Sequence, residues 1–292
     1  MNGAHRMSSV RELLEDAAQE MAGAADEPLM EAQILLAHAL ERDRSWLYAW
    51  PEHVPEASTA ARFRDMVERR ALGQPISHLT GEREFWSLRL TVGPETLIPR
   101  PETEHLVETA LQLRLPDDAR VLDLGTGSGA IALALASERM AWRITATDRS
   151  AAALDVARRN AARLGLHKLC FLLGDWFDTS DALPAFDLIV CNPPYVASGD
   201  PHLERGDVRF EPAGALISGP DGLDDIQRIV ASAPAHLKPG GWLWLEHGRD
   251  QASAVAELLR RQGFVQIGRR RDLAGNDRLS GGQSPPAATT GP

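Results

Sequence analysis

The chain has 292 residues, of which 43% are hydrophobic and 25% charged, so it is long enough for one large hydrophobic core and a smaller module. Its formal net charge of -10 at pH 7 argues against an extended, non-specific grip on nucleic-acid phosphates, which requires clustered lysine and arginine. The only cysteines, Cys170 and Cys191, each lie in an apolar run, which fits a reducing compartment. Neither an export signal nor a membrane-spanning stretch is evident, so we expect a cytoplasmic protein.

The N-terminal quarter of the chain shows apolar residues at helical spacing. The pattern predicts two helices within residues 10–40, broken near Pro28, and a third helix over residues 58–73 with Ser58 as its N-cap. Residues 1–75 are therefore expected to form a small helical domain. Its acidic side chains outnumber its basic ones, which makes it a poor clamp for DNA phosphates.

A different pattern follows the helical domain. Alternating apolar residues predict a strand over 84–92, as half of a hairpin in a linker at 76–96. Residues 97–280 then alternate between apolar strands and amphipathic helices, an order that requires a mostly parallel sheet with helices on both faces. We therefore expect an α/β fold with a doubly wound, Rossmann-like sheet. Residues 281–292 are rich in Gly, Pro, Ser and Thr, which predicts a disordered tail.

The first strand of the predicted sheet ends in a glycine-rich turn that consists of Gly125, Thr126, Gly127, Ser128 and Gly129. Because glycine has no side chain, such residues allow a tight turn and the close approach of a ligand at the carboxyl edge of the sheet. The spacing differs from the dinucleotide fingerprint, so pyrophosphate is not the favoured ligand. A tight turn that binds nothing is the alternative reading.

The next two strands also end in residues suited to a nucleoside. Asp148 ends the second strand, where its carboxylate can accept both ribose hydroxyls, cap the following helix, or do both. After the third strand, Asp175 can accept an exocyclic amine and Trp176 can cover a purine; the alternative is a surface turn with a core tryptophan. Taken together, the glycine turn and Asp148 favour an adenosine ligand.

The fourth strand ends in Asn-Pro-Pro-Tyr, residues 192–195, and is expected beside the first strand, so that Asn192 opens into the same crevice. Pro193 and Pro194 have no N–H, and Pro194 holds Pro193 extended. The Asn192 side-chain oxygen and the Pro193 carbonyl then form a two-acceptor corner for one planar NH2 group, over which Tyr195 can pack. Holding both hydrogens stabilises positive charge that grows on nitrogen and aims its lone pair at an electrophile. A rigid turn without chemistry is the alternative.

From the helical domain to about Leu279 the sequence resembles the HemK/PrmC family, S-adenosylmethionine-dependent methyltransferases that modify the glutamine of the Gly-Gly-Gln motif in peptide-chain release factors. The resemblance is carried by LIPRPETEHLVE (97–108), VLDLGTGSGAIALALA (121–136), GDWF (174–177), NPPY (192–195), RFEPAGALISGPDGLDDIQRI (209–229), LKPGGWLWLEHG (237–248) and DLAGNDR (272–278). NPPY by itself leaves adenine methyltransferases equally open, whereas the other segments favour this family.

The resemblance implies a class I methyltransferase sheet and a role for each motif. The turn at 125–129 would approach the methionine half of S-adenosylmethionine, Asp148 would hold the ribose, and Trp176 would lie by the adenine. Residues 192–195 would hold the substrate glutamine. The segment 97–104 would form a roof, with Pro99 and Arg100 near the cofactor; a helix start and an ordinary surface charge are the alternative.

Three rival functions share these motifs. An exocyclic-amine methyltransferase of nucleic acid would need base flipping and a basic target-reading domain. A ribosomal-protein glutamine methyltransferase would share the chemistry and differ in partner, and a binding module would keep the site without the reaction. We expect a monomer that binds release factors, with no metal, no membrane and no direct nucleic-acid contact.

The expected tail contains Gly281, Gly282 and Gln283, which spell the target tripeptide of the resembled family. A flexible tail could present this glutamine to the site of its own or a neighbouring molecule. Chance in a glycine-rich segment is the favoured reading.

Overall fold

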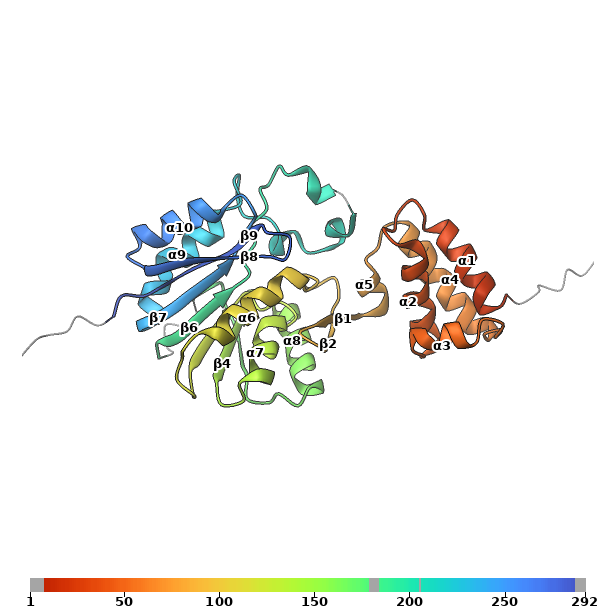
Figure 1. The fold of residues 1–292 in the computed structure, drawn as a ribbon, viewed down its shortest axis with the longest axis horizontal. Coiled ribbons are helices and arrows are strands. Elements are labelled where there is room, and N and C mark those ends of the chain that lie inside the picture. The colour runs from red at the N-terminus through yellow and green to blue at the C-terminus, as the bar shows by residue number, and fades with distance from the viewer. Residues whose placement is uncertain (1–7, 179–183, 205, 287–292) are drawn as a thin grey trace, which may run out of the picture. The chain divides into compact units, whose positions relative to one another are not determined.

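The computed structural model describes residues 8–178, 184–204 and 206–286 (Figure 1). The chain divides into two compact units. The first, called here the helical unit, comprises Met1–Gly81 and His202–Phe210, and the second, the sheet unit, comprises Glu82–Pro201 and Glu211–Pro292. Over the described ranges, no helix combines the length and the apolar character needed to cross a membrane.

Over its described residues, the helical unit contains five α-helices, which have their own hydrophobic core. The helices are α1 (Val10–Glu20), α2 (Pro28–Leu40), α3 (Arg44–Ala49), α4 (Ala57–Ala71) and α5 (Ile76–Thr80). Ser9 and Glu12 form a capping box that starts α1. The apolar faces of α1, α2 and α4 meet in a buried cluster that includes Leu13, Leu36 and Phe63. This unit therefore has an interior separate from that of the sheet unit.

The observed helix boundaries agree only in part with those predicted from the sequence. The predicted break near Glu27-Pro28 is confirmed: Pro28 begins α2, because proline is tolerated in the first turn of a helix. The prediction that Ser58 caps the third long helix is wrong: Glu56 is the N-cap, and its carbonyl already accepts the Ala60 N–H at 2.9 Å. The short helices α3 and α5 were not expected, since each is too brief for a clear helical period.

A distant segment, His202–Phe210, belongs to the helical unit. The guanidinium of Arg70, which is buried, donates to Glu31 at 2.6 Å and to Asp207 at 2.9 Å. Glu31 lies on α2, whereas Asp207 lies in the 3-10 helix Gly206–Phe210. A buried charge needs such partners to offset its desolvation. The helical unit is therefore discontinuous in sequence, unlike the domain expected at 1–75.

The sheet unit contains a seven-stranded sheet with the order β5-β4-β3-β6-β7-β9-β8. Its strands are β3 (Arg120–Leu124), β4 (Arg143–Asp148), β5 (Cys170–Leu173), β6 (Phe186–Cys191), β7 (Leu237–Glu246), β8 (Val265–Arg271) and β9 (Asp277–Gln283). Strands β3 to β7 are parallel, and β9 runs antiparallel to both β7 and β8. The predicted pairing of the fourth strand of this sheet, β6, with its first, β3, is confirmed.

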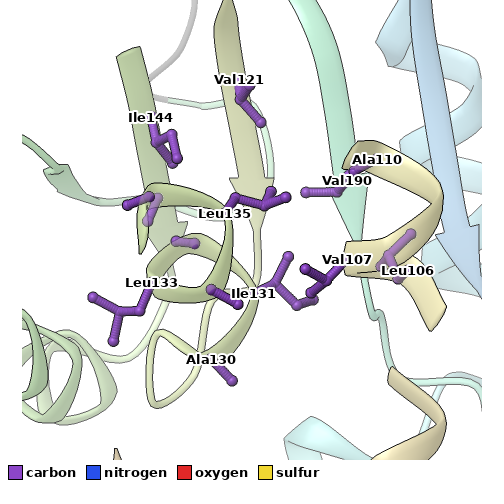
Figure 2. Packing of buried hydrophobic residues seen from close by; sticks show 14 of the residues in the cluster. Leu106, Val107, Ala110, Val121, Ala130, Ile131, Leu133, Leu135, Ile144 and Val190 are labelled. Atoms are coloured by element: carbon purple, nitrogen blue, oxygen red, sulfur yellow. The ribbon is translucent and has the colours of Figure 1, made fainter. Parts of the chain in front are cut away.

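Helices cover both faces of this sheet (Figure 1). They are α6 (Glu104–Gln112), α7 (Ala130–Glu138), α8 (Ala151–Arg163), α9 (Asp224–His236) and α10 (Ala252–Arg261). Successive residues of a strand point to opposite faces. Val121 of β3 therefore lies in a buried cluster with residues of α6 and α7 (Figure 2), whereas Leu122 and Leu124 lie in a second cluster with residues of α9 and α10. This arrangement confirms the predicted doubly wound α/β fold.

The expected strand at 84–92 is in fact a complete hairpin. Strands β1 (Glu82–Phe85) and β2 (Leu88–Thr91) are antiparallel, and the two residues between them, Trp86 and Ser87, have φ of 51° and 58°. Two-residue hairpin loops favour such left-handed pairs because their twist matches that of the strands. Neither residue is the glycine or asparagine that signals this turn, which is why the alternating pattern was read as one strand.

The prediction of a disordered tail from residue 281 is wrong at its start. Gly281, Gly282 and Gln283 lie in β9 between β7 and β8, and Gln283 Nε2 donates to the Gly240 carbonyl at 2.8 Å. Glycine is required at position 281, because a Cβ on Gly281 would come within 2.3 Å of the Trp244 ring. Composition suggested a disordered tail, whereas the close approach of Trp244 explains Gly281. Residues 287–292 lie outside the described part of the chain.

Candidate active site

The carboxyl ends of β3, β4, β5 and β6 open into one pocket of the sheet unit. The expected site residues that line it are Gly125, Gly127, Asp148, Asp175, Trp176, Asn192 and Pro194. Glu95, Thr96 and Leu97 line it from the segment before η1 (Pro101–Thr103), and Pro212, Gly214 and Ala215 from the segment that follows residue 210. Parallel strands bring these sequence-distant ends together, as the sequence analysis expected.

The glycine turn divides into residues that face the pocket and residues that hold the turn. Gly125 and Gly127 line the pocket with φ of 68° and 56°, values that favour glycine. Gly129 caps α7, and a Cβ there would come within 2.9 Å of Leu133. Thr126 and Ser128 are buried beneath the turn and do not line the pocket.

Hydrogen bonds fix the turn from below. Thr126 Oγ1 donates to the carboxylate of Asp123 at 2.6 Å, and Asn160 of α8 donates to the Ser128 carbonyl at 2.9 Å. Asn160 also exchanges two hydrogen bonds with the backbone of Thr91 at the end of the hairpin. The hairpin, α8 and the glycine turn thus form one connected support for the pocket.

Asp123 is a fully buried carboxyl beneath the glycine turn. Desolvation raises its pKa to about 7, the Thr126 hydrogen bond opposes this, and the charge of Asp148 adds to it. Sequence analysis placed Asp123 only inside a strand and gave it no role.

Asp148 joins the ends of β3 and β4. One of its carboxylate oxygens accepts the Gly127 N–H and the other accepts the Ser150 N–H, each at 2.9 Å. The reading of Asp148 as a helix cap is wrong, because Ser150 is the N-cap of α8 and accepts the Ala153 N–H. Each carboxylate oxygen has a second lone pair, so Asp148 retains acceptor capacity toward the pocket.

Trp176 and Asp175 lie in the pocket wall with different attachments. The Trp176 backbone has a φ of 50°, and its indole N–H donates to Asp225 at 3.1 Å, which holds the ring against Gly125. Asp175 accepts from Arg228 at 2.7 Å, so part of its acceptor capacity serves an ion pair. The ion pair gives Asp175 a structural partner that the sequence did not indicate.

The Asn-Pro-Pro-Tyr segment follows β6 and forms a fixed corner. Asn192 and Pro194 line the pocket, whereas Pro193 and Tyr195 do not. The backbone beyond is held by pairing of Val196 with 216–218, and the Tyr195 carbonyl accepts from Gln251 at 3.1 Å. Among the residues that the structure describes, no hydrogen bond to the Pro193 carbonyl is present.

Two buried residues behind this corner were missed by sequence reasoning. Asn192 Nδ2 donates to Thr103 Oγ1 at 3.2 Å, and Thr103 Oγ1 donates to Glu246 at 2.7 Å. The Tyr195 hydroxyl donates to the other oxygen of Glu246 at 3.2 Å. Burial raises the pKa of Glu246 to about 6 and the pKa of Tyr195 above its usual value. A polar residue at the end of the apolar strand β7 is the signal that could have found Glu246.

Of the expected roof at 97–104, Leu97 lines the pocket and residues 98–104 do not. Arg100 forms an ion pair with the buried Glu211, which also accepts the Ile98 N–H at 2.9 Å. Neither Pro99 nor Arg100 lines the pocket, so their expected proximity to a cofactor has no support in the pocket lining. Arg149 reaches across from the end of β4 and donates to the Gly214 carbonyl at 2.6 Å.

The sheet unit has the doubly wound fold of the class I methyltransferases. A methyltransferase from Pyrococcus furiosus has the same fold, with a TM-score of 0.52 at 19% identity over 68% of this chain and 89% of that one. Two family models match, the PrmC N-terminal domain over residues 12–81 and the methyltransferase small domain over 102–214. Over the described ranges, no cluster of potential metal ligands is present.

Relatives of known name cover nearly the whole chain. A protein of Xylella fastidiosa named release factor glutamine methyltransferase is 52% identical over 88% of this chain and 93% of its own length. One of the same name from Vibrio cholerae is 48% identical over 89% of this chain and 91% of its own. The chain belongs to the family of release factor glutamine methyltransferases, which confirms the resemblance seen in the sequence motifs.

Proposed function

We propose that the protein transfers a methyl group from S-adenosylmethionine to the side-chain amide nitrogen of the glutamine in the Gly-Gly-Gln motif of peptide-chain release factors. Family membership supports this reaction, because the relatives that match nearly the whole chain carry that name. The observation that carries the chemistry is the placement of Asn192 in the same pocket as the glycine turn and Asp148.

The residues of the pocket fit S-adenosylmethionine. Gly125 and Gly127 leave room at the turn, and a Cβ on Gly125 would press against the Trp176 ring at 3.2 Å. Asp148 would hold the ribose through its free acceptor capacity, and Trp176 would cover the adenine. When bound, the cofactor would supply an electrophilic methyl group and leave as S-adenosylhomocysteine.

The chain's own task in the reaction is to orient a weak nucleophile. The lone pair of an amide nitrogen is delocalised into its carbonyl, so the NH2 group must be held and aimed. The Asn192 side-chain oxygen and the Pro193 carbonyl are suited to accept its two hydrogens, and both acceptors follow the same strand. Acceptors fixed in this way stabilise the positive charge that develops on nitrogen during transfer.

A direct assay tests this function. The purified protein would be incubated with labelled methyl donor and, separately, with release factor, ribosomal protein or DNA. We expect label in the release factor alone, located by peptide mass spectrometry on the Gly-Gly-Gln glutamine. Transfer to ribosomal protein or DNA but not to release factor would refute the proposal.

We further propose that the helical unit docks the body of the release factor and so raises the effective concentration of its glutamine at the pocket. The support is a pair of exposed aromatic side chains at α3, Tyr48 and Trp50, which are 66% and 59% exposed. Exposed aromatic residues are enriched at protein interfaces. A purely stabilising role for the unit is the alternative.

Truncation is a poor test of docking, because removal of residues 1–75 would also strip Asp207 of its partner Arg70. Surface variants of the full chain avoid this problem. Tyr48→Ser with Trp50→Ser should reduce methylation of whole release factor and spare a short Gly-Gly-Gln peptide. Leu72→Ser, at a 75% exposed apolar residue of the same unit, is the matched control. Equal losses on both substrates would favour the stabilising role.

That the protein acts in the cytoplasm, as a monomer and without direct contact to nucleic acid, stays a prediction.

A further inference from the structure

A buried chain of hydrogen bonds connects the substrate corner to a carboxylate that does not line the pocket. It runs from Asn192 Nδ2 to Thr103 Oγ1 at 3.2 Å and from Thr103 Oγ1 to Glu246 Oε2 at 2.7 Å. Thr103 is 4% exposed and Glu246 is 1% exposed. The residues come from the end of β6, from η1 and from the end of β7, so three separate elements converge on this chain.

The chemistry of the groups fixes the direction of each bond. An ionised carboxylate only accepts, so Glu246 takes the hydroxyl hydrogens of both Thr103 and Tyr195. A threonine hydroxyl has a single hydrogen, and once Glu246 holds it, Thr103 offers only lone pairs to its other neighbour. Asn192 must therefore turn its NH2 toward Thr103, which turns its oxygen away.

We propose that Thr103 and Glu246 are positioning residues that determine which end of the Asn192 amide meets the substrate glutamine. An asparagine amide is nearly symmetric in shape, and rotation by half a turn exchanges its donor and acceptor ends. Without the relay both orientations are open, and in the wrong one two NH2 groups face each other. This inference rests on the proposed function, in which the Asn192 oxygen accepts a hydrogen of the substrate amide.

The decisive variant removes one hydroxyl without opening a large cavity. Thr103→Val keeps the branched shape and loses the hydrogen bonds to both Asn192 and Glu246. We expect kcat on a Gly-Gly-Gln peptide to fall about 10- to 100-fold, the scale of a lost oriented contact, with unchanged affinity for the methyl donor. Thr103→Ser restores the hydroxyl and should recover most of the lost kcat.

A matched control lies on the adjoining helix. Thr109 of α6 is also a buried threonine, but it lies outside the pocket lining and the relay. Thr109→Val therefore reports what the same change of atoms does to the fold alone. If Thr103→Val does not fold, Thr103→Ala provides the same loss of the hydroxyl with more room for adjustment.

A double-mutant cycle separates positioning from general structural support. If Thr103 acts through Asn192, Thr103→Val should cost little further activity in an Asn192→Ala background, measured in single turnovers with labelled donor. Full additivity of the two losses, or equal kcat for Thr103→Val and wild type, would overturn the inference. The proposed function fails separately, if wild type does not methylate release factor or Asn192→Ala methylates it normally.

Discussion

The indole of Trp176 lies against the backbone of Gly125, so that a Cβ on this glycine would be 3.2 Å from the ring atom Cζ3. The segments that follow β3 and β5 thus meet at the pocket, and their contact requires that residue 125 has no side chain. Because Trp176 is anchored to Asp225 through its N–H, the ring has little freedom to withdraw.

Gly125→Ala should lower both stability and cofactor affinity. A φ of 68° costs an alanine about 1 kcal/mol or more, and the new methyl group would displace the Trp176 ring. Gly165→Ala is the matched control, since Gly165 has a φ of 70° and its Cβ would meet no neighbour. Thermal unfolding should show a loss in both variants, whereas calorimetry should show weakened cofactor binding only for Gly125→Ala. Equal cofactor affinity in the two would remove Trp176 from the binding surface.

Asn192→Ala should retain the fold and cofactor binding and lose catalysis. We expect kcat to fall by about 10²- to 10³-fold, the scale of a removed transition-state contact. Steady-state kinetics on a Gly-Gly-Gln peptide and calorimetry with the cofactor measure the two effects separately. Turnover at the wild-type rate would eliminate the two-acceptor corner as the mechanism.

Asp148→Asn should weaken cofactor binding without a comparable effect on kcat at saturating donor. The lost charge reduces binding of ribose hydroxyls by about 1 to 3 kcal/mol, the range for a charge-assisted hydrogen bond. Asparagine perturbs the site less than alanine would, because Asp148 also accepts the N–H groups of Gly127 and Ser150, and an asparagine can retain one of these hydrogen bonds. Calorimetry that finds an unchanged affinity would contradict the assigned role.

The turnover rate should fall as the pH drops through about 6. Burial raises the pKa of Glu246 to about 6, the charge of Glu102 adds to this, and hydrogen bonds from Thr103 and Tyr195 and the charge of Arg278 oppose it. Protonation releases the Thr103 hydrogen and removes the preference for one Asn192 orientation. The check is the pH profile of kcat, in which Thr103→Val should lack this step.

Acid unfolding can be distinguished from this effect by its sign. Because the pKa of Glu246 is higher in the folded state than its usual value, the folded state takes up the proton more readily. The contribution of Glu246 to stability therefore increases as the pH falls through about 6, while activity decreases. A loss of activity that coincides with a loss of the folded form would point to another group.

The sequence predicted the parallel sheet and the ends of its strands, because periodicity and turn residues are local signals. It could not reveal that Arg100 pairs with Glu211 or that Arg228 pairs with Asp175, since these contacts join residues far apart in the chain. Thr103 was missed for the same reason, because it is unremarkable within its own segment, whereas Glu246 is marked locally only as a polar residue at the end of an apolar strand. Their role depends on the convergence of β6, β7 and η1, which only the folded chain provides.

The Gly281-Gly282-Gln283 segment of β9 has a consequence for the protein's own chemical history. The folded molecule contains its own copy of the target tripeptide but holds it within a sheet, where both glycines pack closely against side chains and Gln283 is hydrogen-bonded. A methyl group found on Gln283 in recovered protein would therefore record that this molecule had been unfolded, or not yet folded, when a folded copy encountered it. The mass of Gln283, measured by mass spectrometry, would thus report whether a molecule had been unfolded.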